Sequence, residues 1–255
     1  SIFGGPGNDT LIGGSGNDHL NGESGDDVIS GSDGDDELIG DFGNDTLNGG
    51  AGDDLLRGRE GVDQVSGGLG DDIAAWQSGH DSDVFDGDLG IDELQVIGSS
   101  GNDLIELSVV GQSLQVGIES RILGVSRFER ATIDGRQGND RITTDSLVGF
   151  ASDYPTYELN NFEFTISGDD GQDTIDVSGV TDGFIGFTID GGNGADVISL
   201  PLLPVAATGT SINANSAFGG SGDDTINGGL GDETIDGGEG SDSIVGNEGA
   251  DTLLG

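Results

Sequence analysis

The segment GGPGNDTLIGGSGNDHLNG, residues 4–22, contains one nine-residue pattern twice and begins it a third time. Counted from Gly4 in steps of nine, the pattern continues without insertion to residue 75. Gly fills the fourth place of every unit, Asp fills the sixth, and the eighth is Leu, Ile, Val or Ala. Such a fixed period indicates a repeat architecture. The units are GGPGNDTLI, GGSGNDHLN, GESGDDVIS, GSDGDDELI, GDFGNDTLN, GGAGDDLLR, GREGVDQVS and GGLGDDIAA.

Each unit is predicted to form half of one turn of a coil. Six Gly-rich residues suit a tight loop, because Gly adopts positive φ at little cost, and the next three suit a short strand with one side chain inward. Two halves close one turn, so loops two units apart should stack. We therefore expect two columns of aspartates. Asp9, Asp27, Asp45 and Asp63 form one column, and Asp18, Asp36, Asp54 and Asp72 form the other.

The charge of the chain points to cations as its partners. The 255 residues include 49 acidic side chains against 7 basic ones, which gives a formal charge of −42. Nucleic acid and anionic membrane surfaces are poor partners for such a field, and divalent cations are good ones. There is no Cys, so no thiolate site or disulfide is available. No apolar stretch approaches the length of a membrane span.

Calcium explains why Gly and Asp occur together. Neighbouring loops should lie about 4.8 Å apart, as adjacent strands do, and bare carboxylates at that spacing would repel one another. Ca²⁺ takes 6 to 8 oxygen ligands and accepts both carboxylates and backbone carbonyls. In this interpretation Gly bends the loop and frees its carbonyls, while Asp supplies the charge.

The nine-residue units resemble the RTX, or hemolysin-type calcium-binding, repeat, whose consensus is GGxGxDxUx. The resemblance is tight over residues 4–81 and 219–255 and loose between them. It implies a parallel β-roll with Ca²⁺ held between stacked loops by the sixth-position Asp and loop carbonyls. It also implies a bacterial protein exported by a type I secretion apparatus. Arg59 and Val62 depart from the consensus and are expected to weaken adjacent sites, and Glu233 replaces Asp.

After residue 75 the loops persist at wider spacing. One column is expected to run through Asp81, Asp103, Asp140, Asp173, Asp196 and Asp224, with one enlarged turn at each step. The opposite half-turn would then carry longer strands such as LIELSVV and SLQVGIE. We favour one continuous right-handed β-helix, and the alternative is a small β domain inserted between Asp103 and Asp173. The predicted metal ligands beyond the first roll are Asp81, Asp92, Asp103, Asp140, Asp173, Asp196, Asp224, Glu233, Asp242 and Asp251.

The sequence thus predicts an all-β chain in three parts: a regular roll over residues 1–97, wider turns over 98–218, and a second roll over 219–255. It begins just before one repeat and ends as Gly255 opens another, so we expect a piece of a longer protein. Residues 119–141 hold five of the seven arginines, which either pair with nearby carboxylates or form a partner surface. Trp76 takes the place of a repeat Gly and is expected to fill a widening core.

The expected function is calcium-dependent folding of a secreted or cell-surface bacterial protein, with several Ca²⁺ ions as cofactors. The chain holds neither a GxSxG nor an HExxH motif, and its two histidines, His19 and His80, fall in variable places, so we do not expect an enzyme. One alternative is an adhesin segment that binds a cell-surface or matrix ligand. Another is the C-terminal module of a secreted lipase, protease or epimerase.

Overall fold

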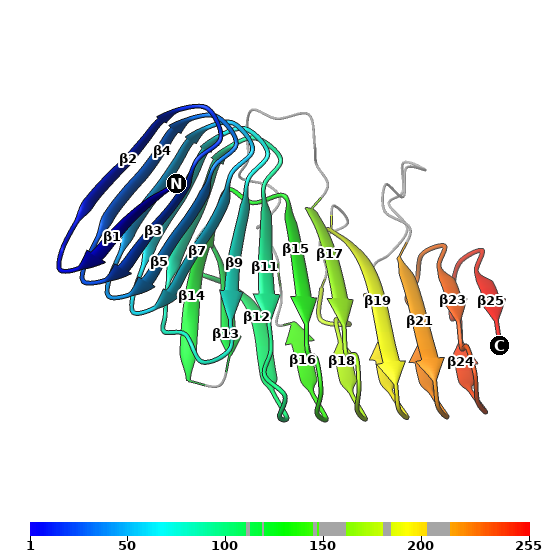
Figure 1. The fold of residues 1–255 in the computed structure, drawn as a ribbon. Helices are drawn as coiled ribbons and strands as arrows, with labels where there is room; N and C mark the ends of the chain where they lie inside the picture. Colours follow the sequence, from blue (N-terminus) through cyan, green and yellow to red (C-terminus); the bar gives the residue numbers. More distant parts are fainter. Residues whose placement is uncertain (111–112, 119, 145–146, 148–161, 181–184, 203–214) are drawn as a thin grey trace. The chain divides into compact units, whose positions relative to one another are not determined.

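The computed structural model describes residues 1–255 except 111–112, 119, 145–146, 148–161, 181–184 and 203–214 (Figure 1). Its regular structure is β throughout the described residues. Among these residues there is no helix of sufficient length and apolarity to cross a membrane. The chain divides into two compact units. The first unit comprises residues 1–97 and 121–132, and the second comprises residues 98–120 and 133–255.

Successive strands of the first unit alternate between two parallel sheets, because each nine-residue unit contributes one strand and each loop reverses the chain. Leu20 pairs with Leu38, and Leu38 pairs with Leu56, so strands two repeats apart are neighbours. One sheet contains β1 (Ile2–Pro6), β3 (His19–Ser24), β5 (Glu37–Phe42), β7 (Leu55–Glu60), β9 (Ile73–Gln77) and β11 (Glu93–Ile97). The other contains β2 (Thr10–Ser15), β4 (Val28–Asp33), β6 (Thr46–Ala51), β8 (Gln64–Leu69), β10 (Val84–Leu89) and β14 (Arg121–Ser126).

The second unit continues the same principle with longer connections. The chain enters it after residue 97 and again within β15 (Arg130–Asp134). One of its sheets contains β17 (Phe162–Ser167), β19 (Ile185–Asn193), β21 (Ser216–Ser221), β23 (Thr234–Asp236) and β25 (Thr252–Leu254). The other contains β13 (Ser113–Ile118), β12 (Leu104–Val110), β16 (Arg141–Thr144), β18 (Thr174–Asp176), β20 (Val197–Ser199), β22 (Thr225–Asn227) and β24 (Ser243–Val245).

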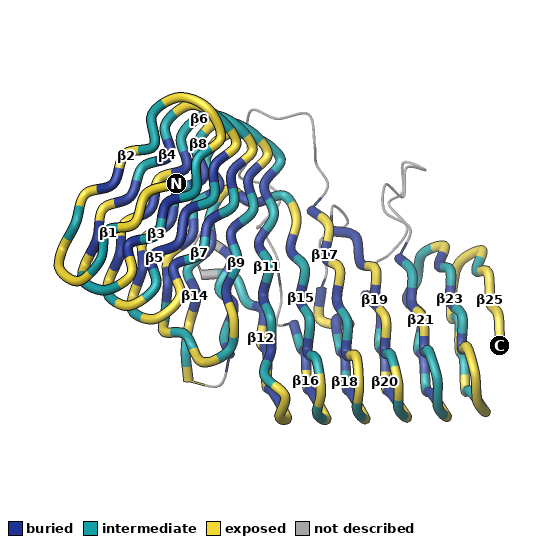
Figure 2. The backbone as a smooth tube through the Cα atoms, in the orientation of Figure 1, coloured by how far each residue is buried: buried dark blue, intermediate teal, exposed yellow. Residues whose placement is uncertain are grey.

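The core is a column of eighth-position side chains between the sheets, visible as the recurring buried segments of Figure 2. Leu20, Leu38 and Leu56 are fully buried, because every second residue of a strand points inward. β9 buries two side chains on its inward face, Ala74 and Trp76, and β11 buries Leu94 and Val96 in the same way. In the second unit Phe164 and Phe187 stack with their ring centroids 5.3 Å apart. Trp76 therefore fills the core, as its place in the repeat predicted.

The predicted all-β parallel β-roll is confirmed, with one local difference at LIELSVV and SLQVGI. These segments were expected on the half-turn opposite the loop column. Instead β12 follows Asp103 directly and pairs in parallel with β16, which follows Asp140. β12 and β13 form an antiparallel hairpin. Only two residues separate them in the sequence, which is too short for a parallel crossover.

Candidate metal centre

Hydrogen bonds join the sixth-position aspartates of successive turns into a ladder. The Asp27 backbone N–H donates to Oδ1 of Asp45 over 2.8 Å, and the Asp45 N–H donates to Oδ1 of Asp63 over 2.8 Å. The other column repeats this bond from Asp18 to Asp92. Each side chain thus reaches back to the turn before it, and this contact uses one carboxylate oxygen.

The other oxygen, Oδ2, is buried and has no hydrogen-bond partner along most of the ladder. A buried carboxylate that is half-satisfied costs free energy unless a positive charge lies beside it. The unpartnered oxygens belong to Asp9, Asp27, Asp36, Asp45, Asp54, Asp63, Asp72, Asp83, Asp92, Asp140, Asp173, Asp196 and Asp224. A row of such oxygens indicates a row of cation sites.

The first-position Gly leaves room in front of this oxygen. A Cβ on Gly40 would lie 2.3 Å from Oδ2 of Asp45 and 2.7 Å from the carbonyl oxygen of Gly58 in the next turn. One carboxylate oxygen and one backbone carbonyl therefore approach the same space. Only Gly keeps that space open, because any side chain would collide with both oxygens.

The fourth-position carbonyls add further oxygen atoms. Gly43 has a φ of 139°, and its Cβ would lie 1.9 Å from the carbonyl oxygen of Gly25 one turn earlier. In the loops of residues 4–72 no backbone N–H donates to these fourth-position carbonyls. Anionic carboxylates and free carbonyls together form the all-oxygen donor set that Ca²⁺ prefers. The residues present therefore fit calcium.

Side chains alone do not make the site. In the part of the chain that the structure describes, no three His, Cys, Asp or Glu side chains converge as in a side-chain metal centre. This is the pattern expected when backbone carbonyls supply most of the ligands and each turn contributes one acid.

Burial raises the pKa of the ladder carboxylates. Desolvation is the main cause, and the neighbouring acid one turn away adds to it, while the backbone N–H partly opposes it. The pKa rises to about 6 for Asp45 and Asp63 and to about 7 for Asp72 and Asp92. These carboxylates thus lack the counter-charge that would keep them fully ionised at neutral pH.

The ladder differs from the sequence prediction at Asp81, because the structure places Asp83 there. The Asp63 N–H donates to Oδ1 of Asp83 over 2.9 Å, at an offset of 20 residues. Asp81 is 57% exposed at its side chain and lies 3.7 Å from Arg121. Trp76 causes this shift. Trp76 stands at the first position of its repeat, where a side chain would collide with the carboxylate of a sixth-position acid. Its indole Nε1–H donates to the Asp81 carbonyl over 2.9 Å, and the loop needs two more residues to rejoin the ladder.

Glu129 is a ladder member that the nine-residue frame missed. The Asp92 N–H donates to its Oε2 over 2.9 Å, and burial raises the pKa of this carboxyl group. The Gly-rich loop is absent here, and Arg127 pairs instead with Asp86 and, over 2.6 Å, with Asp88. One signal could have revealed Glu129: it precedes the strand RATID just as the other acids precede theirs.

In the second unit one column runs unbroken through the enlarged turns. Backbone N–H groups donate to Oδ1 of the next acid at offsets of 37, 33, 23, 28 and 18 residues. The acids joined are Asp103, Asp140, Asp173, Asp196, Asp224 and Asp242. On the opposite side the Glu233 N–H donates to Oδ1 of Asp251 over 3.1 Å.

Asp103 and Glu233 differ from the other acids, because their own loops satisfy them. The Ser99 N–H donates to Oδ2 of Asp103 over 2.6 Å, and the Ser99 hydroxyl lies 3.0 Å from both oxygens. Gly229 and Gly231 donate their N–H groups to the two Glu233 oxygens over 3.2 and 3.1 Å. These two carboxylates have less need of a cation.

A second, exposed ladder at the fifth position was not anticipated. The Asp26 N–H donates to Oδ1 of Asn8, and the Asn44 N–H donates to Oδ1 of Asp26 over 3.0 Å. These side chains reach toward the next turn, opposite to the sixth-position aspartates, so the two ladders clamp each pair of loops from both sides. The signal was available, since Asn or Asp fills the fifth place in most units.

The unusual loop with Arg59 and Val62 keeps its place in the ladder. Arg59 turns outward and pairs with Asp41 over 2.6 Å, and the Val62 N–H donates to Oδ1 of Asn44. The Asp45–Asp63 bond stays at 2.8 Å. The expected weakening of the adjacent sites remains a prediction.

Stacked Gly-rich loops with a buried acidic ladder define a parallel β-solenoid with rows of oxygen atoms along its loops. A family model described as RTX calcium-binding nonapeptide repeat (4 copies) matches residues 3–38, 39–74, 188–200, 211–244 and 228–255. These ranges cover about half of the chain, and the chain belongs to the RTX calcium-binding nonapeptide repeat family. A search of curated proteins found no match.

Proposed function

We propose that this chain is a calcium-dependent folding module whose sixth-position acids bind Ca²⁺ between successive turns. The observation that carries the proposal is the row of buried, unpartnered Oδ2 atoms beside open first-position glycines. Binding and folding, rather than catalysis, are the chemistry that this arrangement supports. When bound, calcium would supply the positive charge that the carboxylates lack.

Calcium would stabilise the folded chain by mass action. An ion that binds only the folded state adds RT ln(1 + [L]/Kd), about 2.7 kcal/mol per site when its concentration is 100 times Kd. Each ion would bridge two turns, so one formed turn favours the next and the transition becomes cooperative. The carboxylates of the unfolded chain repel one another, and the charge of −42 keeps it expanded without the ion.

Calcium-dependent folding would suit a secreted protein. RTX repeats are typical of secreted bacterial proteins. We propose that the chain passes a type I secretion apparatus unfolded, where calcium is scarce, and folds outside the cell, where calcium is abundant. The two predicted rolls, residues 1–97 and 219–255, would respond to calcium most strongly, and residues 98–218 would form the wider part between them.

The ion pairs of the arginines within residues 119–141 favour a structural role for these side chains over a partner surface. Arg127 pairs with Asp86 and Asp88, and Arg121 lies 3.7 Å from Asp81, so these guanidinium groups balance local acids. Calcium-dependent folding would serve equally in an adhesin segment and in the C-terminal module of a secreted enzyme.

Far-UV circular dichroism during a Ca²⁺ titration tests the proposal, with EDTA as the starting state and Mg²⁺ as the control ion. The expected result is a cooperative gain of β signal that Ca²⁺ produces and Mg²⁺ does not. Mg²⁺ should fail because it requires near-octahedral geometry and dehydrates reluctantly. Full β signal in EDTA, with no thermal stabilisation on adding Ca²⁺, would contradict the proposal.

A further inference from the structure

Trp76 opens one sheet of the first unit. The register between β5 and β7 runs from Glu37 and Leu55 to Phe42 and Glu60. Between β7 and β9 it covers only Leu55 with Ile73 and Leu56 with Ala74. A Cβ on Gly58 would lie 2.2 Å from Oδ2 of Asp63, so the acid keeps its place beside this opening. The strands therefore separate just where Trp76 replaces Gly.

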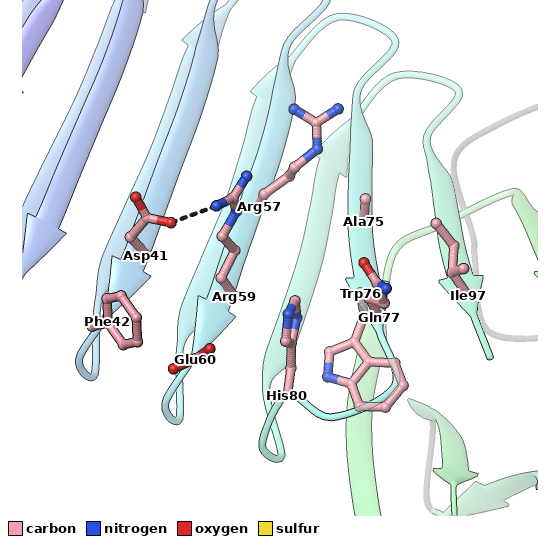
Figure 3. Close-up of a pocket in the computed structure, with 10 residues that line it drawn as sticks. All are labelled: Asp41, Phe42, Arg57, Arg59, Glu60, Ala75, Trp76, Gln77, His80 and Ile97. Atoms are coloured by element: carbon pink, nitrogen blue, oxygen red, sulfur yellow. Dashed lines mark hydrogen bonds and ion pairs between the residues drawn. The ribbon is translucent and has the colours of Figure 1, made fainter. Parts of the chain in front are cut away.

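A cavity of about 410 Å³ lies at this opening (Figure 3). Its lining comes from β5, β7, β9 and β11 and from His80 in the enlarged loop. Figure 3 shows Arg59, Glu60 and His80 around one end, with Phe42 on one side and Trp76 on the other. Ligand pockets begin at about 300 Å³, so the cavity has room for a small molecule.

The polar lining is balanced in charge and rich in planar groups. Arg59 pairs with Asp41 over 2.6 Å, and Arg57 and Glu60 contribute one further charge of each sign. The His80 ring lies edge-on to Trp76, with centroids 6.2 Å apart. Its Nδ1 is buried without a hydrogen-bond partner. Carboxylates, guanidinium groups, an amide and imidazole together offer both donors and acceptors.

An apolar surface accompanies these polar groups. Phe42 lines the cavity and is 59% exposed. Trp76 also borders the cavity but is only 1% exposed, so Phe42 supplies the accessible aromatic face. A ring with hydroxyl groups at its edge and C–H bonds on its face matches this combination, because the face packs on an aromatic ring while the hydroxyls reach planar polar side chains.

We propose that this cavity binds one neutral sugar ring. The charge of −42 disfavours an anionic ligand, Arg57 and Arg59 disfavour a cationic one, and the ion pairs in the lining disfavour a purely apolar one. The ligand is a free monosaccharide or the terminal residue of a glycan. The site lies on the outer face of β5, β7, β9 and β11, and none of its lining residues is an acid of the calcium ladder.

Trp76 is the only tryptophan of the chain and borders this cavity, so its fluorescence serves as a probe of binding there. The calcium-loaded chain is titrated with D-glucose, D-galactose, D-mannose and their methyl glycosides, and with sodium D-glucuronate as the charged probe. Saturation-transfer NMR on the same samples detects binding that leaves the emission unchanged. We expect a saturable response to at least one neutral sugar in the millimolar range. A response to the methyl glycoside identifies a glycan terminus, and a response to the free sugar alone identifies a monosaccharide.

The variants Phe42→Ala and Gln77→Ala should each raise Kd about tenfold, the effect of losing one good contact. Phe3→Ala is the matched control, because Phe3 is also 59% exposed but does not line the cavity, and its Kd should not change. Three results would overturn the proposal: no saturable response to any neutral sugar, tighter binding of glucuronate than of every neutral sugar, or equal affinity in Phe42→Ala and the parent chain.

Discussion

Two loops with nearly the same sequence treat their acids in opposite ways. The loop GDFGND, residues 40–45, leaves Oδ2 of Asp45 buried without a partner. The loop GSSGND, residues 98–103, surrounds Oδ2 of Asp103 with the N–H and hydroxyl of Ser99. Both acids are buried, at 1% and 3% exposure. The fixed Gly and Asp positions therefore do not decide whether a loop needs an ion.

The backbone at the second position makes the difference. Asp41 has a φ of 75°, whereas Ser99 has no positive φ. The loop of Glu233 follows Ser99 in this respect, since Gly229 also lacks a positive φ and donates its N–H group to the acid. When the second residue has a positive φ, the acid faces open space and carbonyls. When it does not, the acid faces N–H donors. We propose that loops of the first kind bind calcium more tightly than loops of the second.

The largest expected effect concerns the fourth-position glycines. Gly43→Ala should lower the free energy of unfolding by about 3 kcal/mol or more, because the new Cβ would lie 1.9 Å from the Gly25 carbonyl at a φ of 139°. Gly101→Ala should cost less than about 1 kcal/mol, since its nearest neighbour is the Ser99 hydroxyl at 3.5 Å. Thermal unfolding in Ca²⁺ compares the two variants. Equal losses would show that the two loops do not differ as described.

A second expected effect concerns pH. The pKa is raised from 3.8 to about 6 for Asp45 and Asp63 and to about 7 for Asp72. Between pH about 4 and 7 the carboxylates of the folded, calcium-free chain still hold protons that the same groups of the unfolded chain have released. The free energy of unfolding of the calcium-free chain should therefore fall as pH rises across this range. With calcium the dependence should reverse, because protons compete for the same carboxylates. Chemical unfolding in EDTA and in Ca²⁺ across this range checks both signs, and a calcium affinity that does not depend on pH would contradict the assignment.

The smallest expected effect concerns Ser99. Ser99→Ala removes the hydroxyl contacts to Asp103 but keeps the backbone N–H, so the loss in EDTA should be about 1 kcal/mol. Added Ca²⁺ should recover part of this loss, because the Asp103 carboxylate without its hydroxyl donor can interact with the ion instead. Ser24→Ala serves as a control, since Ser24 also occupies a repeat loop but stands at its third position instead of its second. A loss that calcium leaves unchanged would assign Ser99 a purely structural role.

The regular roll was predictable because a fixed nine-residue period allows only one arrangement of loops and strands. Asp at the sixth place and Leu, Ile or Val at the eighth fix both the two columns and the inward side chains, and the register of Leu20, Leu38 and Leu56 confirms them. The shift from Asp81 to Asp83 was not predictable from spacing. It depends on how the Trp76 indole packs in the core and on its hydrogen bond to the Asp81 carbonyl, which are matters of packing in three dimensions.

The partner of each acid was also beyond the sequence. GDFGND and GSSGND differ at two places, and Ser occurs at the second position of both the Asp36 and the Asp103 loop. In the first, Ser32 has a φ of 90° and Oδ2 of Asp36 stays unpartnered, while in the second Ser99 turns its N–H inward. The backbone conformation, which the turns on either side select, decides between them.

The most direct test compares Asp45→Asn with Asp103→Asn in thermal unfolding with EDTA and with Ca²⁺. Asparagine keeps the Oδ1 acceptor and removes the charge. If the account is right, Asp45→Asn raises the stability of the calcium-free chain, because it removes an unpartnered buried charge, and lowers the stability of the calcium-loaded chain. Asp103→Asn should lower stability in both conditions, because its amide would face the Ser99 donors. If Asp45→Asn changes stability with the same sign in EDTA and in Ca²⁺, the Asp45 carboxylate does not serve a calcium ion, and the central claim fails.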